Sequence, residues 1–437
     1  MEGVLRVLRR VLRSVGPGVI TGAADDDPSG IATCSQSGAQ YGYGQLWTIL
    51  LLLPMMIAVQ EACARIGIVT GKGIAGVVRE RFHRGVLYLV VGLVVVANTV
   101  NLGTDLGAMA AAAQLILPVS YLGLTVLFAV VCIGLELFVS YRVYSRYLKW
   151  MCISLLAYVI TGILVSHNWI EVLHAAFIPR VEGGFQFLMV LTGLLGTTIS
   201  PYMFFWQASQ EVEEEIMEGR FCPEEGRPEC DPLPNVHSWD IRLMRIDTVV
   251  GMIISQAASG FIILTTAGTL HSAGIRDINT AADAARALEP LVRSFPHAGE
   301  LAKIIFAVGI ICLGLIAVPI FAGSASYALA ESFNWREGLY RRLKDAPQFY
   351  AIIAAAGLIG LCINFAHINP MKALLYTAVL NGVCAVPLIF VILKIGNSRE
   401  IMGEYVSGFW SNAVGWITFA GMGLAAVMMF AAFRWHG

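Results

Sequence analysis

Three consecutive carboxylates, Asp25, Asp26 and Asp27, are followed directly by Pro28 and, two residues later, by Gly30. Carboxylate and backbone carbonyl oxygens are hard ligands that suit Mg²⁺, Ca²⁺ and Mn²⁺. Proline lacks a backbone donor and clashes with the preceding helical turn, while glycine tolerates conformations that other residues avoid. A helix through this segment should therefore unwind, and we expect Asp27 and the backbone carbonyls around Gly30 to bind a hard cation.

A second segment of the same kind runs from Gly196 through Thr197 and Ser200 to Pro201. Small polar residues again precede a proline inside an apolar stretch, which predicts a second interruption. It adds a carbonyl at Thr197 and a hydroxyl at Ser200 to the expected metal ligands, and Asn381, in another apolar stretch, is a candidate amide ligand. Proline and glycine also kink packed membrane helices where there is no site, but two such breaks, one of them beside three acids, favour binding.

Other polar residues lie close to these breaks or within neighbouring apolar stretches. Asp25 and Asp26 flank the expected ligand, and three roles stay open for them: lining the approach, raising the local cation concentration, or capping a helix end. Gln207 lies two turns beyond the second proline and suits either an inward pathway or helix packing. Glu61 and Arg65 are four residues apart, which predicts a structural ion pair on one helix face.

The composition sets the environment in which these residues must work. Of 437 residues, 57% are hydrophobic and only 14% are charged, and the formal net charge is −1. Soluble proteins carry about 25% charged residues, so the 14% found here is too few to cover the surface of a soluble fold. A soluble enzyme and a disordered chain are excluded, and the lack of a basic excess argues against nucleic-acid binding. The composition predicts a polytopic membrane protein in a lipid bilayer.

Eleven apolar stretches are long enough to cross a hydrocarbon core about 30 Å thick, which needs about 20 residues per helix. They lie at 15–40, 44–70, 85–116, 119–140, 145–166, 184–214, 243–269, 298–331, 348–366, 371–395 and 408–433. The first and the sixth contain the two breaks. We therefore expect an all-α polytopic membrane protein with 11 transmembrane helices, of which helices 1 and 6 are broken.

The position of the breaks, at the first helix of each five-helix half, indicates an inverted repeat. In the LeuT-type 5+5 arrangement, substrate binds at the midplane between two such discontinuous helices. We expect residues 15–166 to form the first repeat, 184–395 the second and 408–433 one extra C-terminal helix, all within a single transmembrane transporter domain, 1–437.

Lys and Arg are distributed unevenly between the predicted loops. With a cytoplasmic N-terminus, the inside loops carry Lys72, Arg79, Arg81 and Arg84, then Arg142, Arg146 and Lys149, then Arg336, Arg341, Arg342 and Lys344, then Lys394 and Arg399. The short outside loops carry none before Lys372, and the longer outside segment 270–297 predicts a short surface helix. By the positive-inside rule the N-terminus is cytoplasmic and the C-terminus extracellular, in a cell membrane.

Two other functions fit a membrane chain with buried carboxylates. An intramembrane protease is disfavoured because the acids cluster on one helix and because neither a GxGD nor an HExxH motif occurs. An amino-acid carrier is disfavoured because such sites meet a carboxylate with helix N-termini and would not place three acids there.

Several motifs resemble those of the Nramp family of divalent-metal transporters, over essentially all eleven spans. They are Gly16-Pro17-Gly18, Asp27-Pro28-Ser29-Gly30, Ser37-Gly38-Ala39-Gln40-Tyr41-Gly42-Tyr43, Val69-Thr70-Gly71-Lys72 and Thr104-Asp105-Leu106. The resemblance implies transport of a divalent metal ion, with no cofactor and no obligate protein partner.

The departures from the family pattern bear on the substrate. The family's first-helix motif is Asp-Pro-Gly-Asn, and Gly30 stands here where its Asn ligand belongs. In the sixth-helix motif, Ala-Thr-Val-Met-Pro-His, Ser200 replaces the methionine. Soft sulfur favours transition metals, and a roomier site admits an ion that keeps part of its water shell, as Mg²⁺ does. The pattern resembles the divergent branch of Nramp-related magnesium transporters, with Mn²⁺ expected to pass as well.

Two further departures concern protons. The family's proton route uses the histidine after the sixth-helix proline, here Tyr202, and acids in helix three, of which Asp105 is kept while Ala108 replaces the other. A tyrosine, whose reference pKa is about 10, carries protons poorly at neutral pH. We therefore expect uptake by alternating access without proton coupling; the alternative is a proton-coupled Mn²⁺/Fe²⁺ symporter of the ordinary Nramp type.

Overall fold

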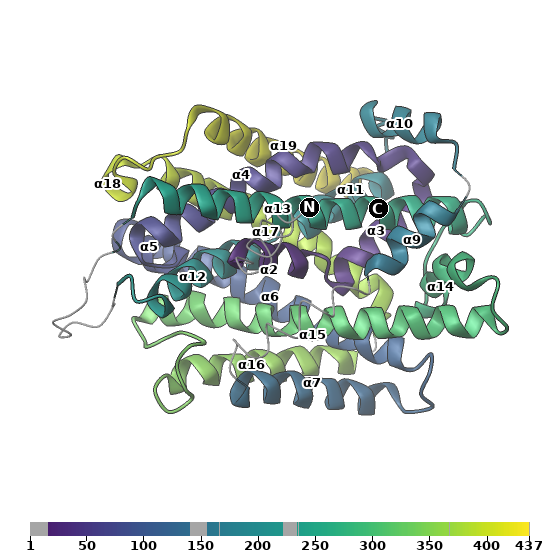
Figure 1. Ribbon diagram of the computed structural model, residues 1–437, viewed down its shortest axis with the longest axis horizontal. Coiled ribbons are helices and arrows are strands. Elements are labelled where there is room, and N and C mark those ends of the chain that lie inside the picture. The colour runs from purple at the N-terminus through teal and green to yellow at the C-terminus, as the bar shows by residue number, and fades with distance from the viewer. Residues whose placement is uncertain are drawn as a thin grey trace, which may run out of the picture.

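The computed structural model describes residues 16–139, 155–165, 167–221, 234, 236–366 and 368–436, and within those ranges every regular element is a helix. Long helices lie side by side, as Figure 1 shows. Those matching the predicted spans are α2 (Pro17–Asp25) with α3 (Pro28–Tyr41), α4 (Trp47–Thr70), α6 (Arg84–Ala113), α7 (Tyr121–Phe138), α9 (Leu156–Leu164), α11 (Phe185–Thr198) with α12 (Pro201–Met217), α13 (Ser238–Thr266), α15 (Ala298–Phe333), α16 (Pro347–Ile363), α17 (Pro370–Gly396) and α19 (Phe409–His436).

Shorter elements connect these helices. They are η1 (Gly42–Gln45), α5 (Ile74–Arg81), α10 (Trp169–Phe177), η3 (Ala267–His271), α14 (Ala281–Ala285), η4 (Arg286–Val292), η5 (Asn364–Ala366) and α18 (Arg399–Met402). The short helix predicted within 270–297 is confirmed by α14 and η4. In Figure 1, α5 and α18 lie at one end of the long helices, and α10 and α14 lie at the other. We refer to these as the α5 end and the α14 end.

In the described part of the chain, nine helical stretches are long and apolar enough to cross a membrane. Two predicted spans are not among them. One is the broken pair α2 and α3, whose halves are each too short to span. The other is 145–166, of which 145–154 and 166 lie outside the described residues. The described spans and both breaks agree with the predicted all-α architecture.

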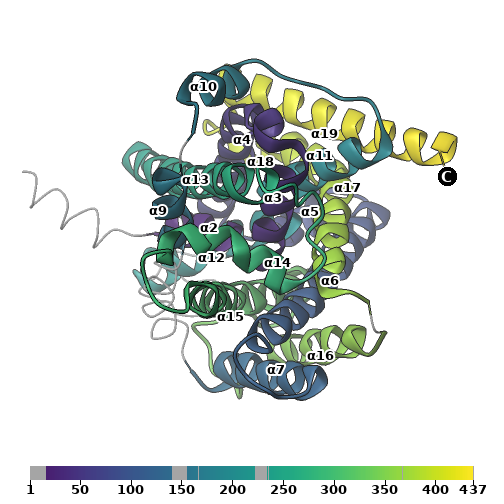
Figure 2. The ribbon, with the colours of Figure 1, turned by 90° about the vertical axis from the view of Figure 1, so that its right-hand side faces the viewer.

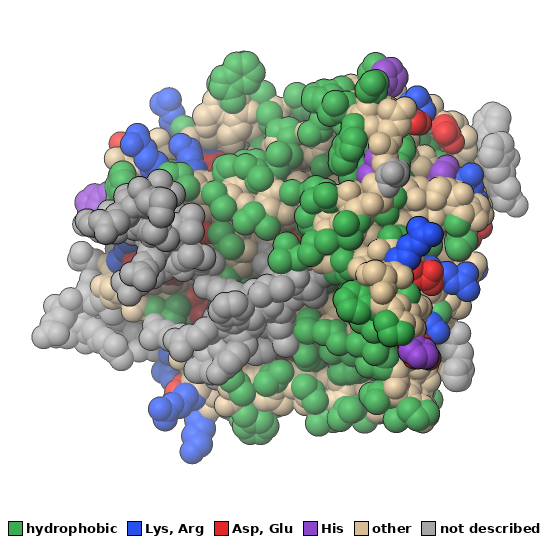
Figure 3. All heavy atoms as spheres, turned by 45° about the vertical axis from the view of Figure 1, so that its right-hand side comes forward, with side chains coloured by type: hydrophobic (Ala, Val, Ile, Leu, Met, Phe, Trp, Pro, Cys, Tyr) green, Lys and Arg blue, Asp and Glu red, His purple; other side chains and the backbone are tan. Residues whose placement is uncertain are grey.

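The outer surface of the bundle is apolar. Val130, in the middle of α7, is 63% exposed, and Leu424, in the middle of α19, is 61% exposed. Figure 3 shows hydrophobic side chains across the middle of the visible face, with Lys, Arg, Asp and Glu gathered toward the two ends of the long helices. Contact with water would be unfavourable for such a surface, whereas contact with lipid tails is not.

Helix ends coincide with residues that local chemistry favours there. Ser120 accepts a hydrogen bond from the Gly123 N–H at the start of α7, and Pro370 occupies the first turn of α17, as is usual for proline. α4 ends at Gly71, whose φ of +63° is a left-handed conformation that glycine adopts at little cost.

The two broken helices lie in the centre of the bundle. Figure 2 shows α2, α3 and α12 surrounded by other helices, with α7 and α16 on one side and α19 on another. Most of the α11–α12 stretch is buried, including the acidic residues Glu211 and Glu213 of α12. The fold therefore places both breaks far from the lipid-facing surface. The division into repeats at 15–166 and 184–395 stays a prediction.

Candidate metal site between two broken helices

The first break separates α2 from α3 over Asp26 and Asp27. Asp27 has an extended backbone, with φ −66° and ψ 169°, and forms the N-cap of α3. Its Oδ1 accepts hydrogen bonds from the Gly30 N–H at 2.6 Å and from Ser29 Oγ at 2.8 Å, while Oδ2 accepts from Ser29 Oγ at 3.0 Å. Pro28 suits the first helical position, where no backbone donor is needed. The carboxylate is thus held rigidly at a helix N-terminus and keeps lone pairs for a cation.

Gly30 presents its N–H, and not a free carbonyl, to this site, since it lies within the first turn of α3. A helix leaves N–H groups unpaired at its N-terminus and carbonyl groups unpaired at its C-terminus. The free carbonyls at this break therefore belong to the last turn of α2, and one of them, on Ala24, accepts from the Tyr202 hydroxyl at 3.0 Å. The structure thus differs from the expectation that carbonyls around Gly30 face the ion.

The second break separates α11 from α12 over Ile199 and Ser200. Ser200 Oγ lies 2.5 Å from the Gly196 carbonyl oxygen and 2.8 Å from that of Thr197, which are left unpaired where α11 ends. The serine hydrogen is used in these contacts, so the lone pairs of Oγ remain available to a cation. The Thr197 hydroxyl donates to the Leu194 carbonyl at 3.2 Å.

Close helix contacts fix the second break in place. A Cβ on Gly196 would lie 2.0 Å from the Ala378 carbonyl oxygen, so only glycine lets α11 approach α17 this closely. A Cβ on Gly193 would lie 3.2 Å from Thr33 of α3, which places α11 directly beside the first broken helix. The two breaks are therefore held by direct helix–helix contact.

Tyr202 joins the two breaks. It lies in the first turn of α12, is fully buried, and donates from its hydroxyl to the last turn of α2. Its ring packs edge-on against Phe321 of α15, with 4.5 Å between the centroids, and its carbonyl accepts from Ser324. The residue that replaces the family's histidine is thus a cross-link between α12 and α2.

The remaining predicted site residues fall into two groups. Asp105 of α6 is fully buried, interacts electrostatically with Asp27, and has no hydrogen-bond partner for either oxygen among the described residues. Asn381 of α17 instead pairs reciprocally with Asn101 of α6, at 2.7 and 3.1 Å. This pairing joins α17 to α6 and directs the Asn381 amide toward Asn101, while its role as a metal ligand stays a prediction.

Gln207 of α12 is fully buried and donates to Glu211 Oε1 at 2.7 Å. Its own oxygen has no partner within the described ranges. The side chain therefore lies in a polar line that continues along α12 toward the α5 end.

Asp25 and Asp26 are bonded to α13, and the charge of Asp27 acts on both. Asp25 accepts from Ser255 Oγ at 2.5 Å and Asp26 accepts from Ser259 Oγ at 3.3 Å. None of the three open roles included this pairing. The two serines were missed in the sequence, although an i,i+4 pair of hydroxyls in an apolar helix is a signal that could have identified them.

Cavities lie at both ends of the bundle, and those at the α14 end reach Pro28 at the first break. At the α14 end, a cavity of about 280 Å³ is lined by Gln36, Asp277 and Lys372 among others. It shares Ala32 and Met371 with a cavity of about 10 Å³ beside Pro28, which is room for about one water molecule. Apolar residues form this narrow part: Ile31, Ala108, Phe306, Ile310 and Leu374.

At the α5 end, a cavity of about 490 Å³ is lined by polar and charged residues, including Glu213, Glu331 and Glu337. Glu213 accepts from the Tyr327 hydroxyl and from the Leu339 N–H, and Glu331 accepts from the Gly76 N–H at 2.8 Å. These acids are thus bonded to neighbouring elements. The cavity of about 490 Å³ thus lies at the α5 end, and the cavity of about 10 Å³ beside Pro28 adjoins the cavity of the α14 end.

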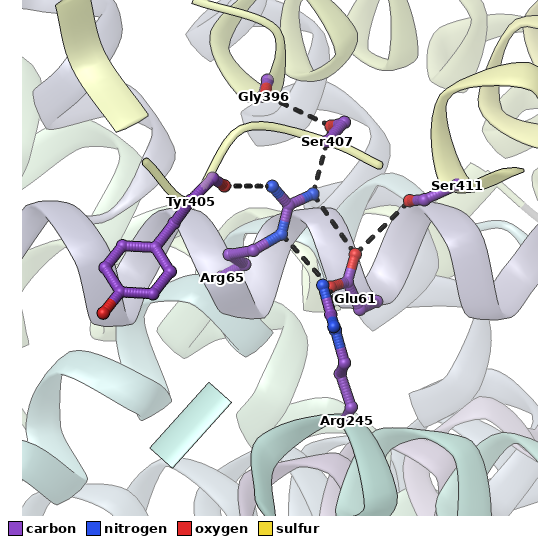
Figure 4. A network of polar contacts seen from close by, with 7 residues as sticks. All are labelled: Glu61, Arg65, Arg245, Gly396, Tyr405, Ser407 and Ser411. Carbon is purple, nitrogen blue, oxygen red and sulfur yellow. Dashed lines mark hydrogen bonds and ion pairs between the residues drawn. The ribbon is translucent and has the colours of Figure 1, made fainter. Parts of the chain in front are cut away.

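An ion-pair network around the buried Glu61 and Arg65 joins helices at the α5 end, as Figure 4 shows. Glu61 accepts from Arg65 at 3.1 and 3.2 Å and from Arg245 of α13 at 2.8 Å. Arg65 also donates to the Tyr405 carbonyl and to Ser407. The predicted Glu61–Arg65 pair is confirmed, and its further partners tie α4 to α13 and to the segment before α19.

Comparisons with known proteins agree with this architecture. The model of the family "Nramp: Natural resistance-associated macrophage protein-like" matches residues 18–432. The divalent metal cation transporter MntH of Ralstonia nicotianae is 28% identical over 432 residues, covering 96% of this chain and 91% of that protein. MntH of Deinococcus radiodurans is 26% identical over 424 residues, covering 94% and 88%.

Solved structures show the same fold. A mutant of the Eremococcus coleocola manganese transporter matches with a TM-score of 0.73 at 17% identity, covering 98% of this chain and 88% of that one. MhsT in complex with L-phenylalanine matches with a TM-score of 0.60 at 9% identity, covering 95% and 98%. At these identities the likeness concerns the fold alone.

Proposed function

This chain belongs to the Nramp family, and we propose that it carries divalent metal cations across a membrane, Mg²⁺ foremost and Mn²⁺ as well. We further propose that transport proceeds by alternating access without proton coupling. Family members are transporters and not enzymes, which excludes the intramembrane protease. The chain is a multi-pass membrane protein.

The ligand at Ser200 carries the proposal about the metal. Its oxygen is held by the Gly196 and Thr197 carbonyls and offers lone pairs at the C-terminus of α11. Together with the Asp27 carboxylate and the carbonyls of the last turn of α2, it makes an all-oxygen ligand set. Such a set suits Mg²⁺ and Mn²⁺ and gives no advantage to softer metals.

The space beside Asp27 supports a partly hydrated ion. Gly30 contributes no side chain next to the carboxylate, and Ser200 is smaller than the methionine that the family pattern has there. Mg²⁺ dehydrates reluctantly and is usually bound through one or two carboxylates with several retained waters. A site with few and small protein ligands therefore fits Mg²⁺ better than a site that requires full dehydration.

The absence of proton coupling is supported by Tyr202 and Ala108. The Tyr202 hydroxyl is engaged with the Ala24 carbonyl between two helices, so its role is structural. Ala108 contributes only a methyl group to the apolar cavity beside Pro28. Neither side chain offers a group that exchanges protons near neutral pH.

A second candidate function is a proton-coupled Mn²⁺/Fe²⁺ symporter of the ordinary Nramp type. One observation favours it: Asp105 is buried, interacts with Asp27, and lacks a hydrogen-bond partner in the described part of the chain. The Eremococcus coleocola relative is named a manganese transporter. Proteoliposomes loaded with a pH dye separate the two functions, since only the symporter acidifies the lumen in proportion to metal uptake.

Competition between metals tests the ligand argument. Flux of Mn²⁺ into proteoliposomes is measured against increasing Mg²⁺ for the wild type, Ser200→Met and the matched control Ser200→Ala. Ser200→Ala removes one oxygen ligand for both metals, so we expect weaker binding of both but the wild-type ratio of Mg²⁺ to Mn²⁺ competition. Ser200→Met should lower this ratio at least 10-fold, because only methionine adds sulfur (about 1.4 kcal/mol of discrimination). Equal Mg²⁺ competition in all three proteins would refute the ligand argument.

The location and orientation are part of the same proposal. Bacterial relatives and the Lys and Arg residues of the inside loops support a bacterial plasma membrane, with the N-terminus cytoplasmic and the C-terminus extracellular. The α5 end then faces the cytoplasm. Accessibility of a cysteine introduced at Glu300, beside the α14 end, to an impermeant thiol reagent in whole cells tests this orientation.

A further inference from the structure

The last turn of α2 lies in backbone contact with α13. A Cβ on Gly22 would lie 2.4 Å from the Gly251 carbonyl oxygen, and a Cβ on Gly251 would lie 2.3 Å from that of Gly18. The two helices run in the same direction, because rising residue numbers on one meet rising numbers on the other. Side chains one turn beyond this contact must therefore face the partner helix at short range.

Two acids and two hydroxyls meet at that level. Ser255 Oγ donates to Asp25 Oδ2 at 2.5 Å, and Ser259 Oγ donates to Asp26 Oδ1 at 3.3 Å. The serines are four residues apart, which is a rise of about 6 Å along α13. Asp25 is 4% exposed and Asp26 is 2% exposed. Both carboxyl groups are thus enclosed between the helices, and they interact electrostatically with each other.

Each carboxyl group keeps one oxygen without a partner. Across the residues that the structure describes, neither Asp25 Oδ1 nor Asp26 Oδ2 accepts a hydrogen bond, and both atoms are buried. Buried polar atoms are rarely left without a hydrogen-bond partner. A buried oxygen without one is therefore a place where a bound ion or water is expected. Carboxylates inside a membrane protein are costly unless paired.

This arrangement is separate from the site at Asp27. The Asp27 carboxylate is bonded to the first turn of α3 and interacts with Asp105 of α6, whereas Asp25 and Asp26 are bonded to α13. The two locations thus differ in their hydrogen-bond partners, while the charge of Asp27 also acts on Asp25 and Asp26. Asp25, Asp26, Asp27 and Asp105 together carry four carboxyl groups, whose charge two dications balance and one dication balances only by half.

We propose that Asp25, Asp26, Ser255 and Ser259 form a second divalent-cation site, occupied in addition to the site at Asp27. Each serine gives its hydrogen to a carboxylate and keeps lone pairs, so the four side chains supply four hard oxygens, and water completes the coordination of Mg²⁺ or Mn²⁺. Two neighbouring dications repel each other, so loading of one site favours release from the other, as in multi-ion conduction.

The inference rests on the proposed function only in that divalent ions must reach the centre of the bundle. Its test is a count of Mn²⁺ ions bound per purified chain by equilibrium dialysis, with electron paramagnetic resonance on the same samples. Wild type is expected to bind two Mn²⁺ whose spectra broaden by mutual coupling. The control Glu300→Gln, at a residue with a 77% exposed side chain, keeps both ions.

Asp25→Asn combined with Asp26→Asn is expected to bind one Mn²⁺ with an uncoupled spectrum, because asparagine keeps an acceptor for each serine but removes both charges. Asp27→Asn is also expected to bind one. If wild type and the Asp25/Asp26 double variant bind the same number, the second site does not exist. If Asp27→Asn binds as many ions as wild type while the double variant loses one, the proposed transport site fails and the second site stands.

A second pair of substitutions keeps the test valid if the double variant does not fold. Ser255→Ala with Ser259→Ala leaves both acids in place but removes two ligands that also orient them. Loss of such supporting groups weakens metal binding by about 10-fold or more, so the second Mn²⁺ should bind at least 10-fold more weakly while the first is unchanged. Unchanged binding of both ions by this variant would overturn the proposal.

Discussion

Replacement of Asp27 by asparagine should separate cation binding from folding. The carboxylate accepts three hydrogen-bond contacts from the first turn of α3, and asparagine is as good an N-cap as aspartate. What asparagine lacks is the charge. Removing one partner of a buried charge pair costs about 3 kcal/mol or more, which corresponds to about 100-fold weaker binding of Mn²⁺ or Mg²⁺.

Asp27→Ala gives a contrasting result. It removes the N-cap, at a cost of about 1–2 kcal/mol, and leaves the Ser29 hydroxyl without its acceptor, for about 1 kcal/mol more. We therefore expect the alanine variant to lose about 3 kcal/mol of stability in addition to losing metal binding. The asparagine variant should unfold within about 1 kcal/mol of the wild type.

Three measurements on the same preparations test this reasoning. Thermal unfolding in detergent gives relative stability, calorimetric titration with Mn²⁺ gives affinity, and proteoliposome uptake gives flux. The reasoning fails if Asp27→Asn binds and transports Mn²⁺ like the wild type, since the carboxylate would then act only as a helix cap. It also fails if both variants are equally destabilised.

Further predictions concern packing, the ion network and pH. Gly251→Ala should lower stability by about 1–3 kcal/mol, because the new methyl group would lie 2.3 Å from the Gly18 carbonyl oxygen; Gly92→Ala, whose methyl meets nothing within 4 Å, should not. Arg65→Lys keeps the charge but replaces three directed donor nitrogens by one, and should cost about 2 kcal/mol. Burial and then neighbouring carboxylates raise the pKa of Glu337 well above its ordinary value of 4.5, so wild-type stability should fall as pH rises above 4.5, and Glu337→Gln should flatten that decline.

Thermal unfolding in detergent checks all three. Equal midpoints for the two glycine variants would show that α2 and α13 separate at no cost. A midpoint for Arg65→Lys equal to that of the wild type would mean that the network in Figure 4 adds no stability. For Glu337 the sign follows from proton binding: between 4.5 and its raised pKa the folded chain keeps a proton that the unfolded chain releases. A wild-type stability that rises over this range would contradict the assignment.

The positions of both breaks could be predicted because their causes are local. Pro28 and Pro201 each begin a helix in the structure, as their missing donors require. The polarity of the break could also have been derived: α2 ends there and α3 begins, so the free carbonyls precede Asp27 and the free N–H groups follow it. The expectation about Gly30 overlooked this direction.

Pairings between distant helices could not be predicted, because a sequence does not give the rotation of each helix about its axis. Asn381 was a candidate amide ligand, and nothing in the sequence indicated that its amide would pair with Asn101 of α6. Tyr202 was considered only for proton transfer, and its contact with Ala24 depends on how α12 crosses α2. The separation of Asp25 and Asp26 from Asp27 likewise arises from packing against α13.

Contact of both halves of the first broken helix with α13 has a mechanical consequence. α2 touches α13 at Gly251, and α3 touches it near Thr266, where a Cβ on Gly38 would lie 2.0 Å from the threonine Oγ1. The continuous helix α13 thus packs against both α2 and α3 across the break between them. Separating either half from α13 would break these close contacts, so a change of access that carries α13 along keeps the packing intact.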